Sequence, residues 1–286
     1  MTETVRIFEV GPRDGLQNEA QVIPVARKMA LIDALAKAGL QEIEIGSFVS
    51  PKWVPQMADT DQVMAGVGFM EGVRLTVLVP NMKGWQGFAA ARVPGGRYQV
   101  AVFISASEGF SQSNLNCSVA QAVERAAPVV AAARAAGVDV RGYVSCVTDC
   151  PFDGPVAPAA VAEAVGMLLT LAPMQVSLGD TIGKATPETT AAMLDAVTAV
   201  VPAADLAGHF HDTGGQALAS VDVALRYGLR AFDGAVGGLG GCPYAPGAPG
   251  NLATEALVAH LHAQGYETGV DLDALEMATG MAKDMR

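Results

Sequence analysis

The chain has few cysteines and few basic residues. It contains four cysteines among 286 residues, and none of them forms a CxxC pair, so a structural zinc site is not expected. Lysine and arginine together number 18 against 29 aspartates and glutamates, which gives a formal net charge of −11. This charge argues against nucleic acids and anionic membrane surfaces as partners. It leaves a small anionic substrate open, because a local basic patch can lie on an acidic protein.

Long apolar runs are also lacking. The longest one, around residues 126–133, is rich in alanine and is interrupted by Pro128. No segment therefore reaches the roughly 20 apolar residues that a membrane-spanning helix needs. The N-terminal sequence MTETVRIFEV has no basic region followed by an apolar core, so it does not read as a secretory signal. We expect a cytoplasmic protein with reduced thiols.

Short β-rich segments and longer helical segments alternate along the chain, and 51% of the residues are hydrophobic. Strands are expected at residues 5–10, 42–45, 73–79, 98–104, 138–145, 175–178, 206–211 and 231–236. Helices are expected at residues 25–38, 119–136, 158–170, 187–200, 216–227, 253–264 and 272–283. This alternation predicts a (β/α)8 TIM barrel with an extra C-terminal helix, forming one catalytic domain over residues 1–286. The alternative is a doubly wound open sheet, which usually has a glycine-rich phosphate loop where this chain has GPRDGLQ.

A pair of histidines lies at the expected end of the seventh strand. His209 and His211 belong to the sequence GHFHD. Residues two apart on a strand point to the same face, so both imidazoles project together. Two neutral imidazoles suit a divalent metal ion at the end of the barrel where catalytic residues lie. The alternative is a hydrogen-bonded pair of core histidines.

Charged residues follow the first strand and interrupt the second. Asp14 could supply an anionic ligand, and Arg13 could donate two hydrogen bonds to a carboxylate or enolate oxygen; the alternative is an Arg–Asp pair in a turn. Glu42 and Glu44 alternate with apolar residues and are expected to face the barrel interior. A buried carboxylate must be paired, protonated or bound. For Glu44, a structural pair with Arg13 and a direct catalytic role both remain open.

A glycine-rich segment, GGLGGCPY, follows the eighth strand. Glycines favour a mobile loop, and we expect this one to be a lid that carries Cys242 to the site. A thiol there could transfer a proton if its pKa fell near neutrality; the alternatives are an unreactive cysteine or a phosphate-binding loop. Asn251 follows, as either a helix N-cap or a neutral metal ligand.

Together these segments resemble the 3-hydroxy-3-methylglutaryl-CoA lyase family, within the wider group of metal-dependent barrel lyases and Claisen-type synthases. The resemblance extends over residues 8–270. It is carried by the stretches EVGPRDGLQNE (9–19), SFVSPKWVPQM (47–57), RGYVSC (141–146), SLGDTIG (177–183), HDTGGQALA (211–219) and GLGGCPYAPGAPGNLATE (238–255).

The resemblance implies a metal-dependent carbon–carbon lyase. It assigns one Mg²⁺ or Mn²⁺ ion to Asp14, His209, His211 and Asn251. It implies retro-Claisen cleavage of hydroxymethylglutaryl-CoA to acetyl-CoA and acetoacetate, a step of leucine degradation and ketone body formation. Arg13 is then expected to stabilise the enolate oxygen, and Cys242 to protonate the enolate carbon, with His209 or Asp14 assisting the first proton transfer. Glu44 is expected to orient Arg13 or to bind the outer shell of the metal.

The resemblance also leaves points open. Lys52 and Lys83 are candidates for binding the phosphates of the acyl-CoA substrate, and we expect a homodimer or a larger homo-oligomer. Ala235 stands where the family usually has serine, and residues 108–110 differ from the lyases of the family. A lyase for a longer branched acyl-CoA, such as an isohexenyl analogue, and a Claisen condensing enzyme therefore remain alternatives. A non-catalytic metal-binding barrel is a third.

Overall fold

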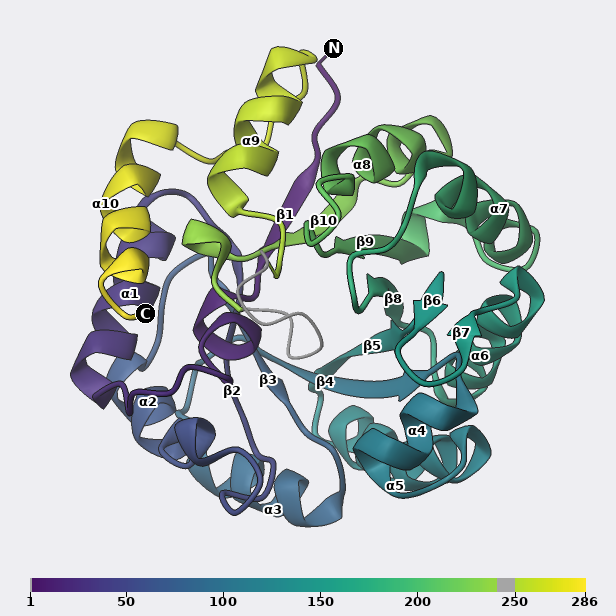
Figure 1. Ribbon diagram of the computed structural model, residues 1–286. Helices are drawn as coiled ribbons and strands as arrows, with labels where there is room; N and C mark the ends of the chain where they lie inside the picture. The colour runs from purple at the N-terminus through teal and green to yellow at the C-terminus, as the bar shows by residue number, and fades with distance from the viewer. Residues whose placement is uncertain (1, 241–249) are drawn as a thin grey trace.

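The computed structural model describes residues 2–240 and 250–286. Within these residues, eight parallel strands form a closed barrel in the order β1-β10-β9-β8-β5-β4-β3-β2 (Figure 1). The strands are β1 (Arg6–Glu9), β2 (Glu42–Ser47), β3 (Arg74–Leu78), β4 (Tyr98–Ser105), β5 (Asp139–Ser145), β8 (Gln175–Asp180), β9 (Leu206–Phe210) and β10 (Ala231–Gly234). Because β1 pairs with β10, the sheet has no open edge. The predicted TIM barrel is confirmed, and the open sheet is excluded.

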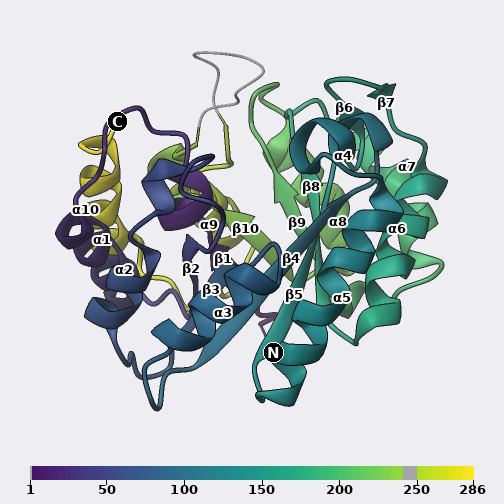
Figure 2. The same cartoon turned by 90° about the horizontal axis from the view of Figure 1, so that it is seen from below.

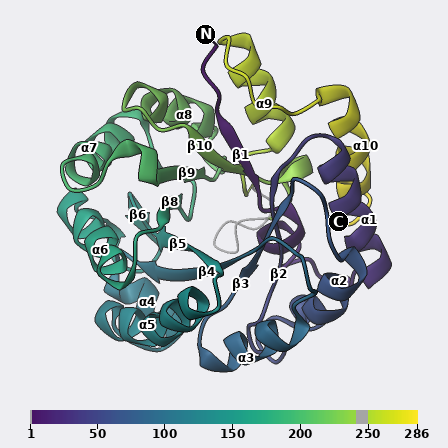
Figure 3. The same cartoon turned by 180° about the vertical axis from the view of Figure 1, so that it is seen from behind.

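Helices surround the barrel, as the views from the front and from behind show (Figures 1 and 3). They are α1 (Val25–Lys37), α2 (Thr60–Val67), α3 (Met82–Ala91), α4 (Glu108–Leu115), α5 (Val119–Ala135), α6 (Pro158–Leu171), α7 (Pro187–Thr198), α8 (Ala217–Arg226), α9 (Thr254–Ala263) and α10 (Leu272–Lys283). The extra C-terminal helix, α10, packs beside α1. None of the helices in the described ranges is long and apolar enough to cross a membrane.

Three helices, α2, α3 and α4, were not predicted. The sequence of α3, MKGWQGFAAA, contains two glycines, which are poor helix formers. Their place in the helix is explained by packing against Phe48. A side-chain carbon on Gly84 would lie 2.8 Å from the Phe48 carbonyl oxygen, and one on Gly87 would lie 2.8 Å from the Phe48 ring. Close packing therefore overrides helix propensity here.

Apolar and charged side chains alternate along β2, as the sequence predicts. Ile43 and Ile45 are buried in the core cluster between strands and helices. Glu44 is fully buried on the opposite side, inside the barrel, and Arg141 and Asp233 are likewise buried. Seen from the side, α4 and the short hairpin of β6 (Asp149–Cys150) and β7 (Gly154–Pro155) lie at the same end of the barrel (Figure 2).

Candidate active site

A π-helical turn, η1 (Gly11–Gly15), carries Arg13 and Asp14 directly after β1. The N–H of Leu16 donates to the carbonyl oxygen of Gly11 at 2.9 Å, five residues earlier. Such turns are rare and recur at functional sites. Gly15 allows the turn to pack closely, because a side-chain carbon there would lie 2.6 Å from Leu239. This turn places two neighbouring charged side chains at the mouth of the barrel.

Arg13 is held between two carboxylates. Its Nε and Nη2 atoms both lie 2.7 Å from Oε2 of Glu44, and its Nη1 lies 2.5 Å from Oδ1 of Asp14. Burial raises the pKa of the Glu44 carboxyl, and the Arg13 guanidinium offsets part of that increase. The other oxygen of Glu44, Oε1, has no hydrogen-bond partner among the described residues. Glu44 thus pairs with Arg13 and fixes its orientation.

Three ligand atoms converge beside this pair. Single side-chain atoms of Asp14, His209 and His211 lie within 4.8 Å of one another, and the two imidazole Nε2 atoms are 3.3 Å apart. Phe210, between the histidines, packs into the core instead. Two imidazole nitrogens and a carboxylate oxygen aimed at one point are a donor set that fits a divalent cation.

The protonation of His211 and Asp14 also fits a cation. Burial and the neighbouring His209 lower the pKa of His211 to about 4, which keeps its imidazole neutral. Burial alone would raise the pKa of Asp14, but Arg13 and the two imidazoles hold it well below its usual range. A neutral imidazole and an ionised carboxylate are the forms that bind metal.

Asn251 completes the cluster. It is buried, and its Nδ2 donates to Oδ2 of Asp14 at 2.8 Å and to the Leu239 carbonyl oxygen at 3.2 Å. The following helix, α9, begins at Thr254 and its N-cap is Ala253, so the N-cap interpretation of Asn251 is wrong. The oxygen and nitrogen of an amide are assigned from the hydrogen bonds around it, and a cation between these groups would favour the oxygen.

Sequence reasoning missed Asp233, which orients His209 by contacting Nδ1, the ring nitrogen on the side away from His211. One carboxylate oxygen of Asp233 lies 3.0 Å from Nδ1 of His209 and accepts a hydrogen bond from Ser177 at 2.8 Å. The other accepts from Nη2 of the fully buried Arg141 at 2.6 Å. Burial alone would raise the pKa of Asp233, but Arg141 and His209 lower it. A carboxylate on the far nitrogen of a histidine directs the near nitrogen toward a metal.

Tyr143 extends this network to Glu44. Nη1 of Arg141 donates to the Tyr143 hydroxyl at 3.0 Å, and that hydroxyl lies 3.4 Å from Oε2 of Glu44. The strand alternation that predicts an interior position for Glu44 predicts the same for Arg141 and Asp233, so the sequence carries a signal for both residues.

Glu9 is a second residue to which the sequence analysis assigned no role. Its Oε1 accepts from the backbone N–H groups of Gly11 at 2.7 Å and Val236 at 2.9 Å, and its Oε2 accepts from the Thr254 hydroxyl at 2.6 Å. Burial raises the pKa of Glu9 to about 7. Glu9 thus joins η1, the turn η4 (Val236–Gly238) and α9. Ala235 contributes to this junction through backbone hydrogen bonds, which serine would make equally.

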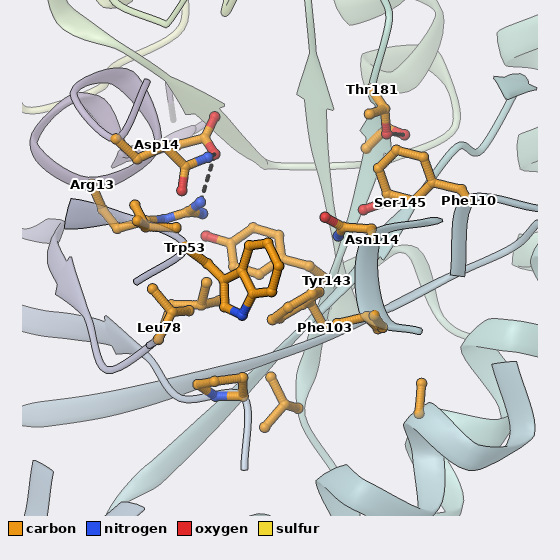
Figure 4. A pocket seen from close by; sticks show the side chains of 18 of the residues that line it. Arg13, Asp14, Trp53, Leu78, Phe103, Phe110, Asn114, Tyr143, Ser145 and Thr181 are labelled. Atoms are coloured by element: carbon orange, nitrogen blue, oxygen red, sulfur yellow. Dashed lines mark hydrogen bonds and ion pairs between the residues drawn. The ribbon is translucent and has the colours of Figure 1, made fainter. Parts of the chain in front are cut away.

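The cluster opens into a cavity of about 790 Å³ (Figure 4). Polar groups line one part of it, namely Arg13, Asp14, His209, His211 and Asn251. Apolar and aromatic side chains also line it, namely Trp53, Leu78, Phe103, Phe110 and Tyr143, with polar residues such as Asn114 and Ser145 among them. A cavity lined by apolar and aromatic side chains, with a cluster of convergent polar groups, is typical of small-molecule sites.

The remaining predicted residues lie at or beyond the rim. Lys83 is exposed and lines an adjacent cavity of about 500 Å³ that shares Val49, Ser50 and Asn81 with the larger one. Lys52 is exposed, and its ammonium group lies 5.6 Å from the centroid of a Trp53 ring. Cys242 lies outside the described residues. The preceding Gly240 lines the larger cavity.

With this geometry in place, comparison with known proteins decides the family. The HMGL-like family matches residues 4–281. The chain belongs to the HMGL-like family. A curated HMGL-like relative, the hydroxymethylglutaryl-CoA lyase of Pseudomonas mevalonii, is 54% identical over 96% of this chain and 89% of its own length.

Two further HMGL-like proteins are similar over nearly the whole chain. The 3-hydroxy-3-isohexenylglutaryl-CoA/hydroxymethylglutaryl-CoA lyase of Pseudomonas aeruginosa is 52% identical over 96% of this chain and 90% of its own length. The crystal structure of the HMG-CoA lyase from Brucella melitensis superposes with a TM-score of 0.96, at 56% identity and 99% coverage of both chains. Fold and sequence thus agree on the family.

Proposed function

We propose that this chain is a carbon–carbon lyase that cleaves 3-hydroxy-3-methylglutaryl-CoA to acetyl-CoA and acetoacetate. The observation that carries the proposal is the convergence of Asp14, His209 and His211 beside Arg13 in the main cavity. The relatives named as lyases for this substrate, at 52–54% identity, support the same reaction.

The reaction breaks the bond between C2 and C3 of the acyl group. The 3-hydroxyl loses its proton and its oxygen becomes the new carbonyl of acetoacetate. The electrons of the broken bond pass to C2 as the enolate of acetyl-CoA, which then takes up a proton. Asp14, His209, His211 and Asn251 would hold a divalent cation, which we propose to be Mg²⁺ or Mn²⁺, and this cation would supply a Lewis acid for the negative charge that develops on the 3-oxygen.

Arg13 stabilises the enolate oxygen in this proposal. Its guanidinium is almost fully buried, and Glu44 and Asp14 hold it in one orientation. A cation fixed in advance, in a site from which water is excluded, stabilises developing negative charge without reorganisation during the reaction. Glu44 is thus a positioning residue for Arg13.

The two proton transfers of the reaction are assigned to different residues. His209 or Asp14 assists removal of the hydroxyl proton, since both lie in the ligand cluster. Cys242 donates a proton to C2 of the enolate. Support for this role comes from Gly240, which precedes the cysteine-bearing segment and lines the cavity.

The phosphates of CoA need cations at the rim of the site. We assign them to Lys52 and Lys83, which are exposed beside the two adjoining cavities. The proposal places the enzyme in the cytoplasm, in leucine degradation and ketone body formation, as a homodimer or larger homo-oligomer. Light scattering of the purified protein tests the oligomeric state.

The test of the reaction uses purified protein, hydroxymethylglutaryl-CoA and Mg²⁺ or Mn²⁺, with and without a chelator, and detects acetoacetate. We expect product only with metal. His211→Ala should abolish the metal-dependent rate, whereas His262→Ala, at an exposed histidine bonded to Thr268, should leave it unchanged. Absence of acetoacetate with either metal would contradict the proposal.

A further inference from the structure

Trp53 is exposed in an unusual place. The chain has two tryptophans; Trp85 is 9% exposed and belongs to the core, whereas Trp53 is 79% exposed and lines the main cavity. An indole offers a large, rigid apolar surface, and leaving it in contact with water is unfavourable. Exposed apolar side chains in a cavity mark contact surfaces for ligands.

The loop that carries Trp53 is anchored by buried polar groups. Nζ of Lys28, which is 2% exposed, lies 2.6 Å from Oδ1 of Asp59 and also donates to the Gln56 carbonyl oxygen. The Gln56 side chain accepts from the Ile23 N–H at 3.0 Å and donates to the Gln21 carbonyl oxygen at 2.7 Å. These bonds connect residues 56–59, which follow Trp53 closely, to α1 and to the segment before it. The backbone of the loop is therefore anchored near Trp53 before any ligand binds.

The indole has the Lys52 ammonium group 5.6 Å from a ring centroid, and it shares the cavity with apolar side chains. Leu78 and Tyr143 are buried in one small cluster, and Phe103 packs against it. Figure 4 shows Trp53 projecting into the cavity among these side chains, with Arg13 also in view beside the cavity. The cavity thus presents apolar side chains beside its charged groups, and polar residues such as Asn114 and Ser145 line it as well.

This arrangement matches the substrate of the proposed function, on which the inference rests. Around C3 the acyl group carries a hydroxyl, a carboxymethyl group, the thioester arm and one apolar alkyl branch. The polar substituents suit Arg13 and the metal ligands, which leaves the alkyl branch for the apolar side chains. We infer that Trp53 covers the alkyl branch at C3 and determines how well the enzyme discriminates a methyl branch from a longer one.

Kinetics with two substrates test the inference. Trp53→Ala should lower kcat/KM for hydroxymethylglutaryl-CoA and open space for a longer branch. The ratio of kcat/KM for hydroxymethylglutaryl-CoA to that for 3-hydroxy-3-isohexenylglutaryl-CoA should fall by about 10-fold or more, the scale on which apolar pockets discriminate. The ratio for Trp53→Phe should lie between those of the unmodified enzyme and Trp53→Ala. Phe69→Ala, at another exposed aromatic that does not line the cavity, is the control and should leave both values unchanged.

Fluorescence gives a readout that does not depend on turnover. In Trp85→Phe/Cys242→Ser protein, Trp53 is the single tryptophan, and the loss of most turnover allows the emission to be read with the metal present. Hydroxymethylglutaryl-CoA should shift the emission to shorter wavelength, and CoA alone should not.

The outcomes separate the two proposals. The inference would be overturned if the ratio of the two kcat/KM values in Trp53→Ala stayed within twofold of that in the unmodified enzyme. It would also be overturned if CoA alone shifted the emission as much as hydroxymethylglutaryl-CoA does, because the indole would then contact the CoA arm. Absence of cleavage by the unmodified enzyme would contradict the proposed function, and the emission shift would still test whether Trp53 contacts the acyl group.

Discussion

Replacing Glu9 with glutamine removes one buried ionisable group from the junction of η1, η4 and α9. The glutamine oxygen can still accept from the N–H groups of Gly11 and Val236, and its amide nitrogen can donate to the Thr254 hydroxyl oxygen. The substitution therefore preserves shape and most hydrogen bonds and changes chiefly the capacity to ionise.

The magnitude follows from the pKa of Glu9, which burial raises from 4.5 to about 7. Between these values the folded protein binds a proton at Glu9 that the unfolded chain has lost. The contribution of Glu9 to the free energy of unfolding therefore decreases as the pH rises from about 4.5 to 7. The two pKa values differ by about 2.5, which corresponds to about 3 kcal/mol at full ionisation.

Denaturant unfolding of both proteins at several pH values between 4 and 8 measures this effect. Below pH 4.5 both side chains are neutral, so their difference there reports the hydrogen bonds alone and serves as the internal control. The free energy of unfolding of Glu9→Gln, relative to that of the unmodified protein, should then increase by about 3 kcal/mol from pH 4 to pH 8. A difference that stays constant over this range, or that decreases, would refute the reasoning from burial.

Four further predictions concern the site. Asp233→Asn should weaken metal binding about 10- to 100-fold by calorimetry, because the metal-facing imidazole loses its charged partner; unchanged affinity would remove that role. Arg13→Gln should keep the fold, by circular dichroism, and lower kcat/KM by on the order of 10²-fold or more; a near-normal rate would exclude Arg13 from the chemistry. Cys242→Ser should bind metal normally and lose most turnover, and an active variant would mean that another group protonates the enolate. Substituting both Lys52 and Lys83 with glutamine should raise KM and leave kcat unchanged; an unchanged KM would place the CoA phosphates elsewhere.

The barrel could be predicted because the alternation of strands and helices is visible in short stretches of the sequence. Each strand is a short β-rich run between helical segments, and the eight repeats leave few other arrangements. Histidines two apart at a strand end and a carboxylate after the first strand were also visible, since barrel geometry brings strand ends together.

The missed features depend on contacts between distant segments. The helical form of α3 depends on glycines that pack against Phe48, and the role of Asp233 depends on Arg141 and His209 from other strands. The N-cap interpretation of Asn251 was open because a sequence does not fix the first residue of a helix to within two or three positions. Residue spacing could place Asp233 inside the barrel, but it could not identify the partners of Asp233 or the packing of α3.

The ligand cluster joins the two ends of the chain. Asp14 and Asn251 are 237 positions apart, so an ion held between them, as we propose, would act as a cross-link that closes almost the whole polypeptide into one loop. A ligand that binds only the folded state stabilises it by about 2.7 kcal/mol at 100 times its dissociation constant, so the melting temperature should report metal occupancy directly. During synthesis the complete ligand set exists only after residue 251 has been added. Capture of the ion by all four proposed ligands would therefore follow the synthesis of all eight barrel strands, since the last of them ends at Gly234.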